Sequence, residues 1–403
     1  MTVTDLGLID PLVPSVAAIA DATVLSRLVA EAGEELIDRG YLRYKPGTSL
    51  LAALRLRSGP AFAYAVSDAA RPKLAKLVDR APQGSPLHWS LSDGLLLARP
   101  AADRDLPALT DTAGLAGLAG AAEGPREWTT LAYKPQRRWV GRPAGAGDSD
   151  PVLRAYRRRS LPDALTGWRL AEWIADQTPV RLPRLAGRDD RSGVLAVDWL
   201  PGRPLDRVLV DQPTPPRLQS VGAALAAVHS CVCDDDRRLG AEQQTTERLR
   251  AVEAVVAELT TVLPACRPRA AGVLRSLQAT RPLDTDVRPV HGDFSADQVI
   301  IAADGSVGLA DWDRAGWGDP AADLGSLRAS GLPSEAYAVV LEGYRSVREL
   351  PSALRWHAVL AGMLRLTEPL RSCQQDWRSA IAVRLTALEA DCRALAGDQR
   401  ECA

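Results

Sequence analysis

Carboxylate and amide side chains with a spacing suited to phosphoryl transfer gather in the C-terminal third of the chain. Asp293 and Gln298 precede a short apolar run. Asp311 directly follows a second apolar run, residues 307–310, and an Ala-Asp-Gly-Ser turn at 303–306 separates the two. The pattern predicts a β-hairpin. Such a hairpin can hold Asp293 near an acceptor hydroxyl while Gln298 and Asp311 reach a metal ion on nucleotide phosphates.

Three motifs resemble those of the aminoglycoside phosphotransferase and choline kinase superfamily, relatives of the protein kinases: His291-Gly292-Asp293, Asp311-Trp312-Asp313, and Gly318-Asp319-Pro320 with Asp323-Leu324. The resemblance implies that Asp293 is the catalytic aspartate, that Asp311 is the main Mg²⁺ ligand, and that ATP or GTP is the phosphate donor. Gln298 replaces the usual asparagine and keeps an amide oxygen on a side chain one methylene longer. Because some bacterial maltokinases and related actinobacterial sugar kinases also carry glutamine there, we interpret Gln298 as the mark of a subgroup.

Other polar residues near these motifs have structural or open interpretations. Asp313 either binds a second metal ion or braces the loop. His291 is expected, by resemblance, to steady the catalytic loop through a hydrogen bond. Asp319 is interpreted as part of a turn, and Asp323 as a cap at the start of a helix.

The elements that must position these residues are expected to form an α+β, bilobal, protein-kinase-like fold with an additional N-terminal α+β domain. The predicted divisions are an N-terminal cap domain, a small lobe that binds the nucleotide, and a mainly helical large lobe that carries the catalytic loop and the acceptor site: 1–125, 126–200 and 201–403. The resemblance covers only the second and third of these divisions. For the first, a cap that restrains the small lobe is the working hypothesis.

The sequence also contains an internal echo. Tyr44-Lys45-Pro46, with Ala63-Tyr64 downstream, recurs as Tyr133-Lys134-Pro135, with Ala155-Tyr156 downstream. Both stretches predict strand, turn and strand, followed by another strand. The first stretch is either a decayed copy of the second or a chance similarity, and the sequence leaves both open.

Candidate nucleotide-binding residues lie in the predicted small lobe. By resemblance, Arg154 replaces the usual phosphate-binding lysine, and Glu172 on the following helix is its expected partner. The first turn, Lys134–Arg138, has no Gly-x-Gly-x-x-Gly motif, so we expect it to contact phosphate through side-chain charge, above all that of Lys134. The alternative is a basic surface hairpin. By resemblance, the nucleobase is expected at the backbone of Asp198, Trp199 and Leu200.

Acceptor-binding residues are expected in the late helices. Glu368 and Asp376 could hold an amine or sugar hydroxyls, Trp377 could stack on a sugar ring, and Arg371 lies between them in the sequence. The alternative is a solvated helix face with a buried tryptophan.

The resemblance leaves the acceptor open. A hydroxyl of a sugar-containing natural product or antibiotic is favoured by the general resemblance, with resistance or biosynthesis as the role. A sugar or amino sugar is favoured by Gln298 and by the Glu-Pro-Leu-Arg segment at 368–371, which resembles the sugar-kinase branch. The mixed charge of the last 60 or so residues argues weakly for an acceptor that is not strongly cationic. A non-catalytic kinase relative is the third interpretation, since the usual lysine and glycine loop are missing.

Composition excludes several other classes. The chain has 403 residues, 46% hydrophobic and 25% charged, with a formal net charge of −1, so it carries no excess charge for nucleic acid or an anionic membrane. It has no stretch long and apolar enough for a membrane span and no basic, apolar leader, which predicts a cytoplasmic protein. The six cysteines are scattered, and Cys231 and Cys233 have the wrong spacing for a zinc knuckle. The sequence does not indicate an oligomeric state.

Overall fold

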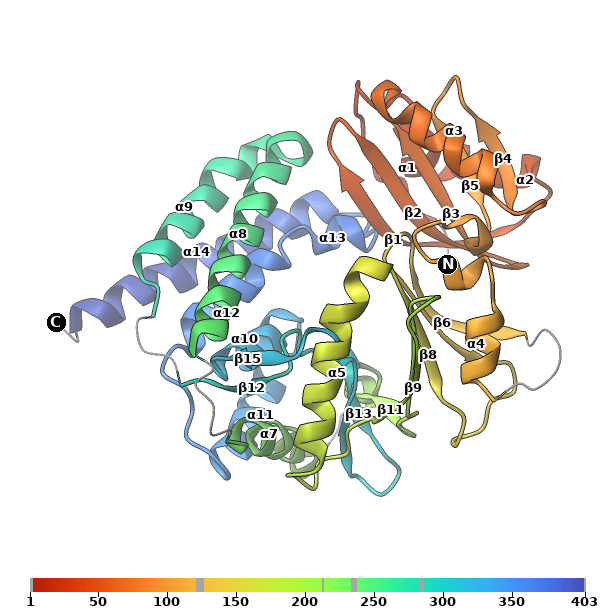
Figure 1. The fold of residues 1–403 in the computed structure, drawn as a ribbon. Helices are drawn as coiled ribbons and strands as arrows, with labels where there is room; N and C mark the ends of the chain where they lie inside the picture. Colours follow the sequence, from red (N-terminus) through yellow and green to blue (C-terminus); the bar gives the residue numbers. More distant parts are fainter. Residues whose placement is uncertain (1–2, 121–126, 212–213, 233–237, 283–285, 402–403) are drawn as a thin grey trace.

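The computed structural model describes residues 3–120, 127–211, 214–232, 238–282 and 286–401. Two five-stranded sheets lie on one side of the molecule and a group of long helices on the other (Figure 1). The predicted boundary at residue 125 falls outside the described residues, and the division into three domains stays a prediction. Among the described helices, none is sufficiently long and apolar to cross a bilayer.

The first sheet is antiparallel and has the strand order β1-β2-β3-β5-β4. Helices α1 and α2 share one buried cluster with one face of this sheet, and α3 shares another with the opposite face. The sheet is therefore buried on both sides, which explains why β2 is almost continuously buried. These elements are β1 (Leu36–Lys45), β2 (Ser49–Leu56), β3 (Gly59–Val66), β4 (Pro86–Ser90), β5 (Leu95–Ala98), α1 (Val16–Ala20), α2 (Ala22–Glu31) and α3 (Arg71–Arg80).

The second sheet repeats this topology, with the order β6-β7-β8-β10-β9 and a helix, α5, between its third and fourth strands along the chain. The echo seen in the sequence is therefore a repeat of structure. Its elements are β6 (Trp128–Lys134), β7 (Arg138–Pro143), β8 (Val152–Tyr156), β9 (Leu185–Asp189), β10 (Val194–Val197) and α5 (Leu161–Ala175).

The register between the two repeats differs from the one that the sequence suggested. Lys45 pairs with Ser49, which pairs with Val66; in the second sheet Lys134 pairs with Arg138, which pairs with Tyr156. Tyr156 therefore corresponds to Val66, not to Tyr64. The similarity of the two Ala-Tyr pairs was misleading because a shift of two residues along a strand returns side chains to the same face.

The two sheets are stacked in series. The face of the first sheet that holds Phe62 and Leu96 packs on the face of the second that holds Leu153 and Val194. The other face of the second sheet, with Leu195, packs on α5 and the catalytic hairpin. The first sheet thus covers the second in the way that the second covers the large lobe, and this burial fixes the orientation of all three layers.

The hairpin predicted to be catalytic is β13 (Val299–Ile301) and β14 (Val307–Leu309), as the two short apolar runs and the turn between them indicated. Strand β11 (Arg203–Pro204) pairs with β13, and β12 (Arg288–Val290) pairs with β15 (Gly316–Gly318). The remaining helices are α4 (Ala113–Leu118), α6 (Leu205–Val208), α7 (Pro215–Ser230), α8 (Arg238–Val262), α9 (Arg267–Ala279), α10 (Ala321–Ala329), α11 (Ser334–Arg345), α12 (Leu354–Leu364), α13 (Glu368–Arg371) and α14 (Trp377–Glu401). Of these, α4 packs on β9 and β10 of the second sheet.

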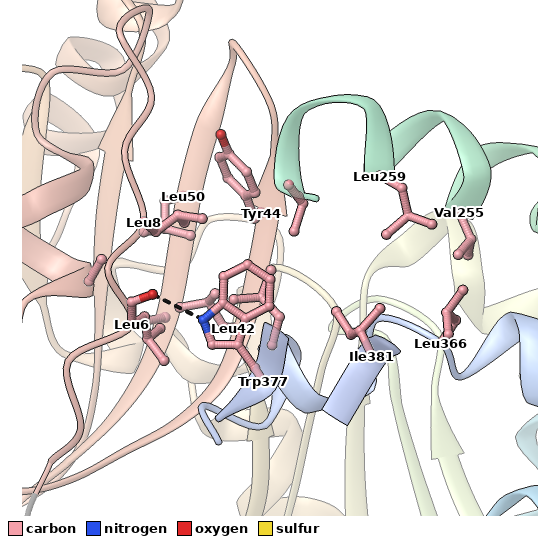
Figure 2. Close-up of a cluster of buried hydrophobic side chains, with 14 of the residues drawn as sticks. Leu6, Leu8, Leu42, Tyr44, Leu50, Val255, Leu259, Leu366, Trp377 and Ile381 are labelled. Atoms are coloured by element: carbon pink, nitrogen blue, oxygen red, sulfur yellow. Dashed lines mark hydrogen bonds between the residues drawn. The ribbon is translucent and has the colours of Figure 1, made fainter. Parts of the chain in front are cut away.

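The N-terminal segment also packs against the C-terminal helices (Figure 2). Trp377, at the start of α14, is fully buried, and its indole N–H donates to the carbonyl of Leu6 at 3.0 Å. Leu42 of β1 and Leu259 of α8 belong to the same cluster. The hypothesis that Trp377 stacks on a sugar is therefore wrong: its ring joins the first sheet to the large lobe, because an indole buries more apolar surface than its single N–H costs.

Candidate active site

Asp323 supports the loop that carries Asp293 by accepting hydrogen bonds from the backbone of that loop. The N–H groups of His291 and Gly292 donate to the two carboxylate oxygens of Asp323 at 2.6 and 2.8 Å, and His229 Nε2 lies 3.2 Å from the same carboxylate. Asp323 is fully buried, and burial would raise its pKa, but the His229 contact and these donors lower it. The sequence suggested that Asp323 caps a helix, and this interpretation is wrong. Asp323 instead supports the loop that carries Asp293.

The loop is also shaped by Gly292, whose φ is +83°. A Cβ atom there would lie 2.1 Å from the carbonyl oxygen of Arg314, so no other residue fits without a backbone shift. His291 lies beside the same loop, with Nε2 2.7 Å from the carbonyl oxygen of Ala310, in line with its expected structural role. Through this contact the loop and the end of β14 are held together.

Asp293 itself remains accessible, with 38% of its side chain exposed. Two guanidinium groups approach it: Arg314 Nη1 lies 3.5 Å from Oδ2, and Arg365 Nη2 lies 3.4 Å from Oδ1. Arg365 is in turn 3.3 Å from Glu368. The candidate catalytic carboxylate therefore faces a side of the cleft that is rich in arginine, which the sequence did not reveal.

The amide of Gln298 has an open coordination position. Gln298 is buried, and its Oε1 accepts no hydrogen bond from the described residues. The N–H of Ala310 donates to the carbonyl of Gln298 at 2.8 Å, which places Gln298 next to the strand end that carries Asp311. A buried acceptor without a donor is costly, and a cation would satisfy it.

Asp311 has an unusual backbone conformation, with φ of +66° and ψ of +58°. This left-handed geometry is uncommon for a residue other than glycine, although aspartate tolerates it better than most. It turns the chain sharply after β14 and directs the following short helical turn into the cleft. In the described residues, no three or more His, Cys, Asp and Glu side chains form a metal site. One amide and one carboxylate nevertheless fit Mg²⁺, which commonly takes few protein ligands and completes its shell with phosphate oxygens and water.

Two arginines and two aspartates form a partly buried cluster between the second sheet and the segment that follows β14. Arg138 Nη1 lies 2.9 Å from Asp311 Oδ1 and also bonds Asp313. Arg154 Nη2 lies 3.0 Å from Asp313 Oδ2 and also bonds Asp311. Burial alone would raise the pKa of Asp311, but the Arg154 and Arg138 guanidiniums hold it well below its ordinary value. The cluster is electrically balanced, two charges against two, so it can persist where an unpaired charge would not.

Asp313 is surrounded by donors. Besides the two arginines, it accepts hydrogen bonds from the hydroxyl of Tyr156 at 2.6 Å and from the indole N–H of Trp168 at 2.9 Å. Of the two interpretations left open by the sequence, this environment favours the one in which Asp313 braces the loop. Its lone pairs are already used by β8 and α5.

The expected pair of Arg154 and Glu172 does not form. Arg154 directs its guanidinium to Asp311 and Asp313, with its Nε donating to Tyr156. Glu172 Oε1 instead accepts the backbone N–H of Leu185 at 3.2 Å. The expectation was wrong because the two carboxylates of Asp311 and Asp313 together offer a guanidinium more than the single carboxylate of Glu172 does.

Lys134 ends β6 close to this cluster. Its pKa is lowered, first by burial and by the cation of Arg138, while the nearby carboxylates of Asp311 and Asp293 act to raise it. Its Nζ also lies 5.8 Å from the ring of Tyr41 in the first sheet. The position is compatible with the phosphate contact that we predicted, which stays a prediction.

The predicted nucleobase segment borders a cavity of about 480 Å³, lined in part by Asp198, Trp199 and Leu200. Asp198 accepts the N–H of Arg184 at 3.1 Å. The guanidinium of Arg142 lies over the Trp199 ring at 4.2 Å. These contacts occupy the two side chains. The N–H of Asp198 also donates to the carbonyl of Arg184 at 2.9 Å, and the contact of this segment with a nucleobase stays a prediction.

The remaining acceptor candidates bind different partners. Glu368 lies 3.4 Å from Arg384 as well as near Arg365. Arg371 pairs with Glu258 at 2.9 Å, and Asp376 is exposed at the start of α14. Of the candidates, Glu368 connects most directly to the catalytic loop, through Arg365 to Asp293.

Sequence reasoning did not assign Arg138, Arg314 and Arg365 to the site. It also missed that Asp323 supports the loop that carries Asp293. Arg138 belongs to the predicted turn, and its place opposite Tyr156 in the hairpin ladder was the available signal. Arg314 follows the Asp-Trp-Asp motif directly. For Arg365 no local signal exists, because its contact with Asp293 spans 72 residues.

Comparisons with known proteins agree with this arrangement. A family model described as "Phosphotransferase enzyme family" matches residues 133–357. Among solved structures, the GDP and kanamycin complex of APH(2")-IIia superimposes with a TM-score of 0.53 at 17% identity, covering 70% of this chain and 99% of that one. The GDP complex of a mutant aminoglycoside 2'-phosphotransferase-IIIa gives 0.52 at 18% identity, covering 70% and 97%. These two likenesses confirm the kinase-like fold.

A choline/ethanolamine kinase family protein from Mesorhizobium loti gives a TM-score of 0.48 at 20% identity, covering 71% of this chain and 94% of that one. No curated protein sequence matches the chain. The family match begins within the second sheet, so residues before it, including the whole first sheet, lie outside the family model.

Proposed function

Because the chain belongs to the phosphotransferase enzyme family, whose members phosphorylate small molecules at a hydroxyl group, we propose that it transfers the γ-phosphate of ATP or GTP, with Mg²⁺, to a hydroxyl of a small sugar-containing natural product. The observation that carries the proposal is the buried Oε1 of Gln298, which has no hydrogen-bond partner among the described residues. Gln298 follows the accessible Asp293 and pairs through its backbone with the strand end that leads to Asp311. A structural cluster would satisfy that oxygen, whereas a site prepared for a cation leaves it free.

In the proposed reaction each side chain has a limited task. Asp293 accepts a hydrogen bond from the acceptor hydroxyl, orients its oxygen toward the γ-phosphate and receives its proton. Gln298 and Asp311 would hold Mg²⁺, which neutralises charge on the phosphates when it is bound. Arg154 and Arg138 supply cations for phosphate oxygens, since their present partners, Asp311 and Asp313, are themselves anions. Lys134, at the end of β6, supplies a third cation. Glu172 supports β9 and has no direct role.

The charge around Asp293 bears on the acceptor. Arg314 and Arg365 flank the carboxylate, and Glu368, the acid that contacts Arg365, is also paired with Arg384. A polycationic acceptor such as an aminoglycoside would meet like charge there. This observation supports a neutral acceptor, either an uncharged glycosylated natural product or, as the second candidate, a neutral sugar.

The test is nucleotide turnover with Mg²⁺ against two sets of acceptors, one of neutral sugars and glycosylated natural products and one of aminoglycosides and amino sugars. We expect turnover in the first set, with phosphate on a hydroxyl by mass spectrometry. Turnover confined to the aminoglycosides would contradict the assignment of a neutral acceptor. Tight nucleotide binding without turnover on any acceptor would instead favour the non-catalytic interpretation.

A further inference from the structure

The turn between β6 and β7 has no backbone donor to offer a phosphate at its tip. Glycine-rich loops of kinases bind phosphate largely through N–H groups. Here Pro135 has no N–H, the N–H of Gln136 donates to Asp103 Oδ2 at 2.6 Å, and the N–H of Arg137 donates to the carbonyl of Lys134 at 3.0 Å. At this tip the carboxylate of Asp103 thus accepts the backbone hydrogen bond that a phosphate would otherwise accept.

Asp103 comes from the segment that precedes the second sheet. Its side chain is buried, with 1% exposed, and Oδ2 also accepts the hydroxyl of Tyr133 at 3.0 Å. Gln136 has φ of +59°, a left-handed conformation that is unfavourable for a residue with a Cβ atom. Arg43 of β1 donates to the side-chain oxygen of Gln136. Two residues from outside the family match, Asp103 and Arg43, therefore hold Gln136 by its backbone and by its side chain.

The ends of this turn connect Gln136 to the candidate site. Arg138 bonds Asp311 and Asp313 directly, and Lys134 pairs with Arg138 across the two strands. Because a turn of this length transmits a backbone displacement to both its ends, the conformation of Gln136 determines where these two cations stand. Misplacement by about 1 Å is enough to weaken a charged contact markedly.

The same anchor occurs in the first sheet. Asp10 Oδ2 accepts the hydroxyl of Tyr44 at 2.7 Å and the N–H of Gly47 at 2.7 Å, at the positions that correspond to Tyr133 and Gln136. The Asp10 anchor holds a turn that leads to no catalytic residue. It therefore offers an internal control: the same hydrogen bonds, in the same topology, away from the cleft.

From these contacts we infer that Asp103 is a positioning residue for the triphosphate: it holds the turn at 134–138 so that Lys134 and Arg138, and not the backbone, meet the phosphates. The inference rests on the proposed function, and it assigns to the region before the kinase-like match a part in nucleotide binding. The nucleoside portion binds elsewhere, so Asp103 acts on affinity for phosphates alone.

The experiment is direct calorimetric binding of ATP and of adenosine, without acceptor, to the full chain and to Asp103→Ala, Asp103→Asn and Asp10→Ala. We expect Asp103→Ala to weaken ATP binding about tenfold or more and to leave adenosine binding within about twofold. Asp103→Asn keeps an oxygen for the Gln136 N–H and should recover most of the ATP affinity. Asp10→Ala should lower the melting temperature about as much as Asp103→Ala does, and it should leave ATP binding unchanged.

The inference is overturned if folded Asp103→Ala binds ATP as tightly as the wild type, or if ATP and adenosine are weakened equally. If Asp103→Ala does not fold, Arg43→Met, which removes only the side-chain contact to Gln136, takes its place. About threefold weaker ATP binding by that variant, with adenosine unaffected, supports the inference, and unchanged ATP binding overturns it. A wild-type chain that binds neither ATP nor GTP would instead contradict the proposed function.

Discussion

The first and second sheets share one topology and differ in chemistry. In both sheets the fifth strand along the chain lies between the third and the fourth. In both, the first strand ends in a Tyr-Lys-Pro turn that a buried aspartate anchors. The corresponding positions that face the next layer are Ser49 and Tyr64 in the first sheet but Arg138 and Arg154 in the second. The difference teaches that the repeat is a scaffold, and that a few charged positions convert one copy into a candidate nucleotide site.

The layer beneath each sheet explains why these substitutions are tolerated. Under the second sheet lie Asp311 and Asp313, which neutralise the two arginines. Under the first sheet lies the apolar outer face of the second, with Leu153 and Val194. An arginine pair placed there would be buried without partners, at a cost of several kcal/mol. The location of charge therefore follows from what each sheet covers.

The most damaging change should be at Asp293, the carboxylate that we propose receives the proton of the acceptor hydroxyl. Asp293→Asn keeps the shape of the side chain but removes its ability to accept the hydroxyl proton, so kcat should fall by about 10³-fold or more. Nucleotide release assays with a responsive acceptor measure this. Asp304→Asn, in the exposed turn of the same hairpin, is the matched control and should retain wild-type kcat. Equal losses in both variants would indicate damage to the hairpin and not to catalysis.

The next largest effect should separate the first sheet from the large lobe. Trp377→Ala removes a fully buried ring and its hydrogen bond to Leu6, and should lower the free energy of unfolding by about 3–5 kcal/mol. Chemical denaturation measures the change. Trp89→Ala, at an indole that is 51% exposed in the first sheet, should cost far less. Similar losses for the two variants would mean that Trp377 is not the main link between these layers.

A substitution that copies a residue of the first sheet into the second should strongly reduce the affinity of the second sheet for phosphate. Arg154→Tyr introduces the residue found at the corresponding position of the first sheet and removes a cation from Asp311 and Asp313. We expect ATP affinity to fall about 100-fold, with nucleoside affinity little changed. Arg154→Lys should retain part of the affinity, because it keeps the charge without the planar fork. ATP binding of Arg154→Tyr at the wild-type level would show that Arg154 only neutralises the aspartates.

The smallest effect concerns Asp103, which anchors the turn of the second sheet as Asp10 anchors the turn of the first. Burial raises the pKa of Asp103 to about 6, against an ordinary value near 3.8, although its hydrogen bonds to Gln136 and Tyr133 act in the other direction. The folded state thus binds the proton more tightly than the unfolded state, so this carboxyl adds stability as the pH falls from 7 through 6 toward 4. The contribution is about 2–3 kcal/mol over that range.

Denaturation at pH 4.5 and pH 7 checks this contribution by comparing the wild type with Asp103→Asn. The wild type should gain stability relative to the variant as the pH falls. A difference between the two proteins that does not change with pH would show that Asp103 titrates as an ordinary carboxyl does.

Much of the site could be predicted because its signals are local. The spacing of Asp293, Gln298 and Asp311 around two short apolar runs defines a hairpin, and hydrogen bonds between neighbouring strands close it within about 20 residues. The Tyr-Lys-Pro echo likewise reports a turn with its flanking strands. In both places the residues that specify the structure are the residues that form it.

The sequence by itself thus determined the hairpin and, through its resemblance to a kinase superfamily, the kinase-like fold. It indicated two similar strand patterns but left open whether they form a repeat. Only the tertiary structure decided that Arg154 meets Asp311 and not Glu172, that Trp377 joins two layers, and that a distant carboxylate anchors the turn at 134–138. Each of these contacts links residues far apart in the chain, or chooses between two charged partners. Such choices depend on burial and on competing electrostatic contacts, which no local pattern records.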